Sequence, residues 1–226
     1  MRRSRVSAFA LIATAWLATG CRHPAPPPPP PAVMQQLTGQ TFFTCCNLHY
    51  DNQDISDANY WVGKLLPAGT FVRVGEVTED AVALSAGDLK LKLTHEYGTD
   101  EEPLDQYLAK VLVKNDPKPR IAAYPKAVRR AIEYGKVEIG MTRDQVLISL
   151  GYPATDRTPS LQNREWAYWY NQRGDRYQVA FDEAGKVSGV IGRPAPTAEV
   201  KILNADAPPK DSSKDSKKSK KHTPQN

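Results

Sequence analysis

The spacing of apolar residues between positions 125 and 192 changes once, from the period of a helix to that of a strand. Apolar residues recur at helical spacing in two short segments, carried by Val128, Ala131 and Ile132 and by Val146, Leu147 and Leu150. After Pro159 apolar and polar residues alternate, which is typical of strands. This part of the chain therefore predicts two helices followed by a small sheet.

The ends of the two expected helices carry recognisable signals. Thr142 and Gln145 have the spacing of a capping box, in which each side chain bonds the other residue's backbone N–H. Gly151 and Pro153 follow the last apolar residue, as at a normal helix end. Pro125 can open the earlier helix, because a first-turn residue needs no N–H.

Three antiparallel strands are expected after Pro159. The second and third strands fix an inner face, formed by Tyr177, Val179, Phe181, Val187 and Ile191. The first strand has aromatic residues on both faces, with Trp166, Tyr168 and Tyr170 on one and Trp169 on the other. At least one aromatic therefore points outward, and register decides which. We take these four aromatics as candidate partner-binding residues, because an exposed large aromatic is typical of an interaction hot spot.

Four motifs of this region occur together in one known family. They are Gly140-Met141-Thr142, Leu150-Gly151-Tyr152-Pro153, the aromatic strand, and Phe181-Asp182 followed by Gly185-Lys186-Val187. In this order they resemble the BamE (SmpA/OmlA) family of outer-membrane lipoproteins, over about residues 125–192. The resemblance implies two helices packed on one face of a three-stranded antiparallel sheet. It also implies a non-enzymatic role in outer-membrane assembly or envelope integrity.

Residues 36–118 have a different pattern, with short β-type runs separated by turn signals. The runs are 41–43, 60–62, 70–74, 81–84 and 89–93. Such spacing predicts a small all-β barrel-like module, and residues 66–70 resemble a loop of bacterial Src-homology-3 barrels. A short helix over 104–111 follows, and residues 116–119 are expected to break it. The fold class is therefore α+β, with separable domains at 36–118 and 120–192.

The first 20 residues read as a secretory signal peptide. Three arginines precede an apolar run that is too short to span a membrane. Residues 17–21 resemble a lipobox, which would make Cys21 the diacylated first residue of the mature chain, although Ala18-x-Gly20 also suits ordinary signal peptidase. The residue after Cys21 is Arg22 and not aspartate, which by the sorting rule of Gram-negative lipoproteins favours transport to the outer membrane. Residues 21–35 then form a stiff polyproline spacer, or a ligand for a proline-reading domain.

Net charge is concentrated at the two ends of the chain. The chain carries a formal charge of +5, while its first five residues contribute three arginines, and its end from residue 205 holds six lysines and three aspartates. The body is thus nearly neutral, which argues against a nucleic-acid groove. Residues 194–226 lack periodicity and are expected to be a disordered Lys-rich tail. The tail is either simply solvated or attracted to an anionic envelope polymer.

The adjacent Cys45 and Cys46, with nearby His49, form the sharpest chemical constellation. In an oxidising compartment they allow a vicinal disulfide, or two thiols on opposite faces of a strand. A metal pair of Cys46 and His49 would need two further ligands, such as His95 and Asp51. We expect structural thiols on a strand and no metal.

Catalytic and cofactor signatures are missing from the sequence. It contains no Gly-x-Ser-x-Gly and no phosphate-binding glycine loop. The acidic run of Glu96, Asp100, Glu101 and Glu102 is expected to be a solvated loop. We therefore expect no enzyme and no cofactor.

The sequence as a whole predicts a lipoprotein anchored on the periplasmic face of the outer membrane. It would bind outer-membrane assembly proteins or other envelope proteins. The alternative is a cell-wall-binding or inhibitor-type module, and a third interpretation is an enzyme that uses the Cys45 and His49 region.

Overall fold

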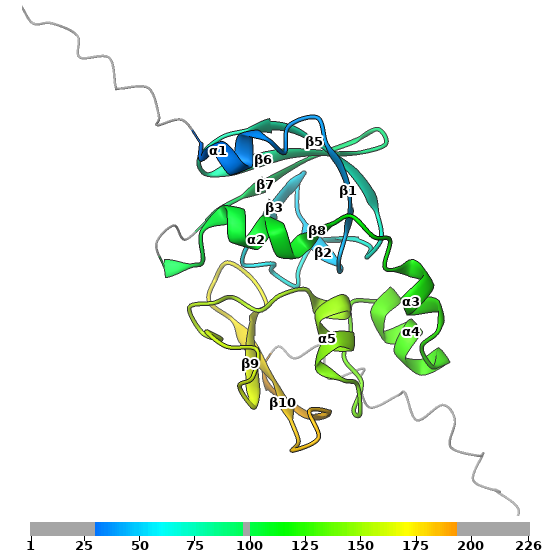
Figure 1. The fold of residues 1–226 in the computed structure, drawn as a ribbon. Helices are drawn as coiled ribbons and strands as arrows, with labels where there is room; N and C mark the ends of the chain where they lie inside the picture. The colour runs from blue at the N-terminus through cyan, green and yellow to red at the C-terminus, as the bar shows by residue number, and fades with distance from the viewer. Residues whose placement is uncertain (1–29, 97–99, 194–226) are drawn as a thin grey trace, which may run out of the picture.

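The computed structural model describes residues 30–96 and 100–193 (Figure 1). The expected signal peptide, Cys21 and the Lys-rich tail lie outside the described residues. Within these two ranges, no helix is both long enough and apolar enough to cross a membrane.

The N-terminal module is built on a curled six-stranded sheet (Figure 1). In sheet order its strands are β3 (Asp54–Ser56), β7 (Leu89–Thr94), β6 (Ala81–Ala86), β5 (Phe71–Val77), β1 (Thr41–Thr44) and β8 (Leu112–Val113). β3 joins β7 in parallel, whereas all other neighbours in the sheet are antiparallel. The sheet curls without closing, so the module is a half-barrel.

Two helices pack against this sheet. The helix expected near 104–111 is α2 (Leu104–Val111), and its buried face joins the core formed by the strands. The short α1 (Ala32–Gln35) contributes Met34, which is buried in the same core. The folded body thus begins inside the segment expected to be spacer, because Met34 supplies an apolar side chain that the half-barrel buries.

Strand alternation explains the central part of the sheet. In β7 the side chains of Leu91 and Leu93 are buried, whereas Lys90 and Lys92 between them are exposed. Each fully buried leucine side chain contributes roughly 1.5–3 kcal/mol. The strands expected over 70–74, 81–84 and 89–93 are confirmed as β5, β6 and β7.

The strand expected over 60–62 is wrong. The chain forms a separate two-stranded sheet on either side of it, from β2 (Leu48–Tyr50) and β4 (Lys64–Leu66). Trp61 and Val62 lie in a bend, and their N–H groups donate to the C-terminal module instead of to a strand of their own module. The apolar residues of this run therefore form part of the contact between the modules and not a strand.

The connection between the modules contains a helix, where residues 116–119 were expected to end the preceding helix and serve as a linker. α3 (Lys118–Ala122) begins directly after Pro117. Pro119 lies in its first turn, where a missing N–H costs nothing. The Asp116 carboxylate accepts the Lys118 N–H at 2.9 Å and supports this start.

The two helices expected in the C-terminal module are α4 (Lys126–Glu133) and α5 (Arg143–Leu150). The capping box of α5 is confirmed, because Thr142 Oγ1 accepts the Gln145 N–H at 3.3 Å and Gln145 Oε1 accepts the Thr142 N–H at 2.9 Å. Gly151 ends α5 at a φ of +79°. A Cβ there would also collide with the Asn59 amide, so conformation and space both require glycine.

The three-stranded antiparallel sheet is confirmed in the order β11 (Val187–Arg193), β10 (Arg176–Phe181) and β9 (Glu165–Trp169). Its inner face packs on α4 and α5, in a core that includes Val146, Leu150, Val179 and Phe181. The turn between β10 and β11 uses Gly185 at a φ of +72°.

The prediction that Ile191 lies on the inner face of the sheet is wrong. Ile191 is 54% exposed and pairs with Gln178 on the outer face. The register shifts at the start of β11, where Phe181 faces Val187 but Ala180 faces Gly189. This bulge adds one residue and reverses the alternation beyond it, so Val190 takes the inner position.

Each module contributes residues to the core of the other. Ala68, from the N-terminal module, is buried among the residues of the C-terminal core, and Trp61 packs on the same cluster. In return Tyr152 packs on the N-terminal core. Independent folding of residues 120–192 therefore stays a prediction.

Candidate functional site

The register of β9 separates its aromatic side chains. Trp166 pairs with Val179 and Tyr168 pairs with Tyr177, so both aromatics face the core and are buried. Trp169 pairs with Arg176 on the opposite, outer face. Burial removes Trp166 and Tyr168 from the candidate partner-binding residues, because neither side chain is accessible.

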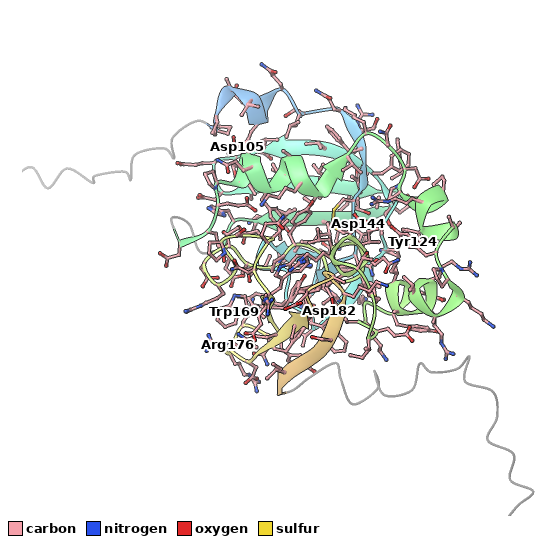
Figure 2. All side chains as sticks on the ribbon, turned by 60° about the horizontal axis from the view of Figure 1, so that its bottom comes forward. Asp105, Tyr124, Asp144, Trp169, Arg176 and Asp182 are labelled. Atoms are coloured by element: carbon pink, nitrogen blue, oxygen red, sulfur yellow. A yellow bond between two sulfur atoms is a disulfide. The ribbon has the colours of Figure 1, made fainter. Side chains whose placement is uncertain are left out.

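Trp169 is half-buried and bordered by cations (Figure 2). The guanidinium carbon of Arg157 lies 5.8 Å from the centroid of its ring, and Arg176 lies opposite it on β10. The neighbouring position on this face, Ala167, is covered, because its N–H donates to the buried Thr158 hydroxyl at 2.9 Å. The open part of the face therefore includes Trp169 on β9 and Ile191 on β11.

Tyr170 makes a contact within the molecule. Its ring stacks on Trp61 with centroids 5.4 Å apart, and Trp61 Nε1 donates to the Gly135 carbonyl at 2.8 Å. Tyr170 thus helps to hold the N-terminal module, and of the four candidate aromatics Trp169 alone points outward.

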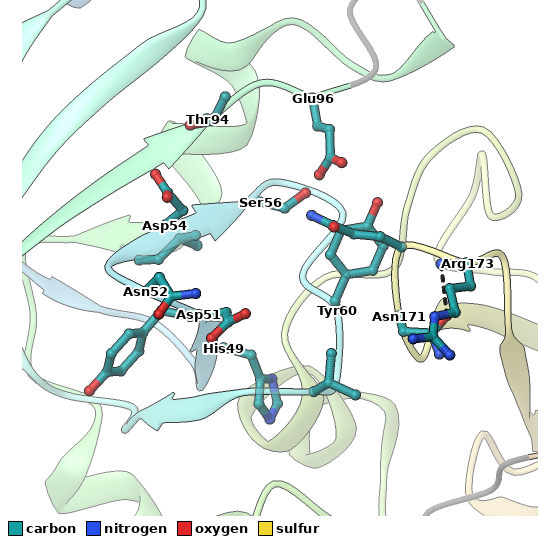
Figure 3. A pocket seen from close by; sticks show the side chains of 14 residues that line it. His49, Asp51, Asn52, Asp54, Ser56, Tyr60, Thr94, Glu96, Asn171 and Arg173 are labelled. Carbon is teal, nitrogen blue, oxygen red and sulfur yellow. Dashed lines mark hydrogen bonds between the residues drawn. The ribbon is translucent and has the colours of Figure 1, made fainter.

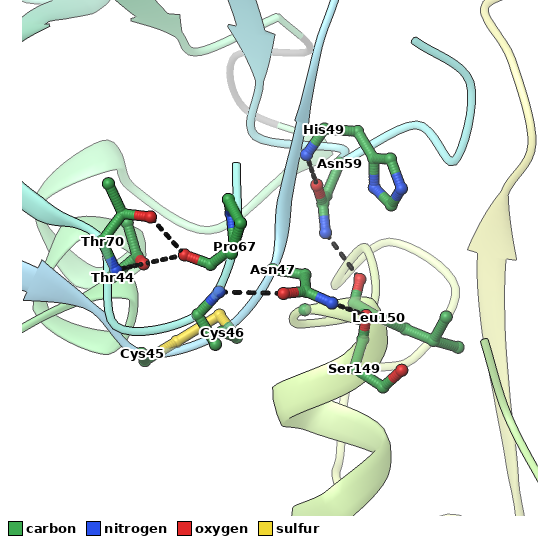
Figure 4. The surroundings of a disulfide bond; sticks show 12 residues. Thr44, Cys45, Cys46, Asn47, His49, Asn59, Pro67, Thr70, Ser149 and Leu150 are labelled. Atoms are coloured by element: carbon green, nitrogen blue, oxygen red, sulfur yellow. Dashed lines mark hydrogen bonds between the residues drawn. A yellow bond between two sulfur atoms is a disulfide. The ribbon is translucent and has the colours of Figure 1, made fainter. Parts of the chain in front are cut away.

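Asn47 binds the ends of both helices of the C-terminal module, and Figure 4 shows it beside the end of α5. Its side-chain Nδ2 donates to the carbonyls of Ile132 at 2.6 Å and Ser149 at 3.0 Å. Its backbone N–H donates to Ile148, and its Oδ1 accepts from the Ala68 N–H. Helix ends leave carbonyl groups unpaired, and here a residue of the other module satisfies them.

Asn59 continues the same arrangement. Its Nδ2 donates to the Leu150 carbonyl at 2.6 Å, while its Oδ1 accepts from the His49 N–H at 3.0 Å. Asn59 adopts a φ of +47°, a left-handed conformation that asparagine tolerates better than most residues. The two asparagines together fix the angle at which the modules meet.

A pocket of about 620 Å³ opens beside this junction (Figure 3). Its walls come from the β2–β3 region, the end of β7 and the turn between β9 and β10. The side chains of Asp51, Asp54 and Glu96 line it, and none forms an ion pair with any residue of the two described ranges. Arg173 and Asn171 lie on the other side, as Figure 3 shows.

His49 also lines the pocket and is only 7% exposed. Burial lowers the pKa of its imidazole to about 4, although a hydrogen bond to Asn59 opposes the shift. His49 is therefore neutral at physiological pH, and the lining carries three negative charges and one positive charge.

Comparison with protein families decides what the C-terminal module is. Residues 128–191 match the family model of the outer membrane protein assembly factor BamE domain. The C-terminal module is a BamE domain. No curated protein and no solved structure matches the chain significantly.

The BamE domain contains one candidate surface and shares the other. Trp169 and the outer sheet face belong to it entirely, whereas the pocket combines its residues 171–173 with the preceding module. Asn47 and Asn59 lie outside the match, yet they bind the ends of its helices. A role in outer-membrane assembly is what such a domain indicates.

The expectation of two separate thiols on a strand is wrong. Cys45 and Cys46 form a vicinal disulfide in the bend between β1 and β2. The Cys46 sulfur is therefore not available to pair with His49 on a metal. Within the described ranges, no group of three or more His, Cys, Asp or Glu residues is placed to hold a metal ion.

The acidic run after His95 is only partly solvated. The Glu101 carboxylate accepts the N–H and the hydroxyl of Thr155, at 2.8 and 2.7 Å, and burial raises the pKa of Glu101. Glu102 pairs with Lys110. Glu101 is thus another contact with the BamE domain, which a run of like charges does not reveal. His95 pairs with the buried Asp57.

Proposed function

We propose that this chain is a lipid-anchored outer-membrane lipoprotein that binds envelope proteins on the periplasmic side and catalyses no reaction. The BamE domain over residues 128–191 supports a role in outer-membrane assembly or envelope integrity. The pattern ending at Cys21, followed by prolines, supports an anchor and a spacer. The Lys-rich tail would add a salt-dependent attraction to anionic envelope polymers.

The partner would contact the outer face of the BamE-domain sheet at Trp169. The observation that carries this proposal is the register of β9, which turns Trp169 outward while Trp166 and Tyr168 are buried. A half-buried indole beside Arg157 offers apolar area with little ordering cost, as hot-spot residues do.

Substitution of Trp169 tests this contact. Trp169→Ala should weaken co-purification of barrel-assembly components from detergent-solubilised membranes by at least about tenfold, which is about 1.4 kcal/mol. The melting temperature should hardly change. Phe71→Ala is a matched control, because Phe71 is an exposed aromatic on the other module. Unchanged capture, or unfolding of the Trp169 variant, would contradict the proposal.

The anchor has its own test. Mass spectrometry of the mature protein should find an acylated Cys21 at its N-terminus. Cys21→Ala should release the protein from the membrane fraction. An unmodified N-terminus, or a Cys21→Ala protein that still fractionates with membranes, would refute the anchor.

A second candidate function is cell-wall binding, which the junction pocket favours. Carboxylates on one side and Arg173 on the other suit a ligand that carries both an amine and a carboxylate, such as a peptide stem of the cell wall. Asp54→Asn should weaken the binding of soluble muropeptides, whereas Asp88→Asn, in a turn of the half-barrel, should not. Equal binding by both variants would remove this candidate.

A further inference from the structure

The Cys45–Cys46 disulfide lies where the chain leaves the six-stranded sheet for the module junction (Figure 4). We propose that this disulfide is a thiol-exchange site for a dithiol protein reductant, and that its reduction loosens the junction between the modules. The proposal rests on local contacts and does not depend on which partner the BamE domain binds.

Both flanks of the disulfide are held firmly. On one side Thr44 forms three hydrogen bonds of 2.8–2.9 Å. The Thr44 N–H donates to the Thr70 carbonyl, the Thr44 carbonyl accepts from the Gly69 N–H, and the Thr44 hydroxyl donates to the Pro67 carbonyl. On the other side Asn47 forms the four hydrogen bonds described above. Only Cys45 and Cys46 lie between Thr44 and Asn47 in the chain. The ring that their disulfide closes therefore determines the position and orientation of Asn47.

The two sulfur-bearing side chains differ in access. Cys45 is half-buried and lines a surface pocket of about 400 Å³ with Lys114, Asp116 and Arg120, whereas Cys46 is 1% exposed. Arg120 is paired with Asp144, and Lys114 offsets Asp116, so access and not charge distinguishes the two sulfurs. A reductant therefore reaches Cys45 first.

The exchange balances with a dithiol. A thiolate of the reductant attacks Cys45 Sγ, the sulfur–sulfur bond breaks, and Cys46 leaves as a thiolate that takes up a proton. The second thiol of the reductant then attacks the mixed disulfide and releases Cys45, which is protonated in turn. Two electrons and two protons pass to the cysteines, and the reductant becomes a disulfide.

Reduction changes the space that the pair needs. Two non-bonded sulfurs lie farther apart than two bonded ones. Cys46 belongs to the closely packed N-terminal core, which does not absorb such a change easily. The 45–46 peptide unit must therefore adjust, and Asn47 follows it directly. Its bonds to Ile132 and Ser149 are the ones at risk.

Amide hydrogen exchange of the full protein, with and without dithiothreitol, tests the proposal. The N–H groups of Asn47 and Ala68 should exchange about tenfold faster after reduction. Those of Val82 and Leu91, in β6 and β7, should not change. The double variant Cys45→Ser, Cys46→Ser should behave like the reduced protein in both conditions.

Three outcomes would overturn the proposal. One is unchanged exchange at Asn47 and Ala68 although alkylation proves full reduction. Another is equal acceleration at Val82 and Leu91, which would indicate global destabilisation. The third is free thiols in the untreated protein. Timed alkylation during reduction should modify Cys45 before Cys46, and the reverse order would contradict the assigned point of attack.

Discussion

The two ends of helix α5 are satisfied in opposite ways. At its N-terminus, Thr142 and Gln145 bond each other's backbone, and they are three residues apart. At its C-terminus, the carbonyls of Ser149 and Leu150 accept hydrogen bonds from Asn47 and Asn59, in the other module. One end is thus closed by neighbours in sequence and the other by a distant part of the fold.

This difference shows how the modules depend on each other. Buried backbone carbonyls need hydrogen-bond donors, so the C-terminal end of α5 stabilises the contact between the modules. An isolated segment 120–192 would keep the capping box but lose both asparagines. We call the C-terminus of α5, which the other module binds, the remote end, and its N-terminus, which the capping box closes, the local end. Substitutions at the remote end should therefore lower the free energy of unfolding more than substitutions at the local end, and they should affect both modules.

The largest effect is expected for Asn47→Ala. The change leaves the Ser149 carbonyl and the Ala68 N–H unpaired, and the Ile132 carbonyl keeps only the Gly135 N–H. Two unpaired buried groups and one further lost hydrogen bond should together cost roughly 3–5 kcal/mol. Denaturant unfolding would measure the loss, and Asn115→Ala, on an exposed asparagine, is the control. A loss below about 1 kcal/mol would show that the remote end is not critical.

An intermediate effect is expected from acid. Because the folded-state pKa of His49 is about 4, below the usual 6.5, the unfolded chain binds its proton first as pH falls. The stability from a neutral His49 is complete above about pH 6.5 and is lost towards about pH 4, by about 3 kcal/mol.

Unfolding curves across this range check the pH effect. His49→Gln should flatten the slope, because the group that titrates is gone. The capping box contains no titratable group, so Thr142→Ala should leave the slope as it is. An unaltered slope in the His49 variant would assign the acid sensitivity to other groups.

The smallest effect is expected at the local end. Thr142→Ala removes one side of the capping box and should cost about 1 kcal/mol. Thr142→Asn should restore most of this loss, because asparagine is also a good N-cap residue. If Thr142→Ala proved as costly as Asn47→Ala, the contrast between the two ends would disappear.

The features that the sequence predicted correctly depend on near neighbours. The capping box, the helix end at Gly151 and the strand over 89–93 each involve residues a few positions apart. The resemblance to the BamE family rests on the same short motifs, and the family match confirms it.

The features that sequence analysis missed depend on distance along the chain. Asn47 bonds residues 85 and 102 positions away, and no local pattern marks such an asparagine as a helix cap. The bulge in β11 depends on how Phe181 and Val187 meet, so Ile191 was placed on the wrong face. The alternation in β9 separated its aromatics into two sets, but only pairing with β10 showed which set is buried.

The bonds from Trp61 and Val62 have a consequence for self-association. They donate to the carbonyls of Trp169 and Tyr170 and so occupy the end of the β9 edge. On the opposite edge, within the described residues, Val187 of β11 bonds Gly140 and Met141, and the strand beyond it is open. An edge strand whose backbone groups are unpaired can accept a strand from another copy, whereas an edge whose groups are already bonded cannot. Edge-to-edge association is therefore blocked at this end of β9, and the described residues of β11 after Val187 leave the other edge available for it.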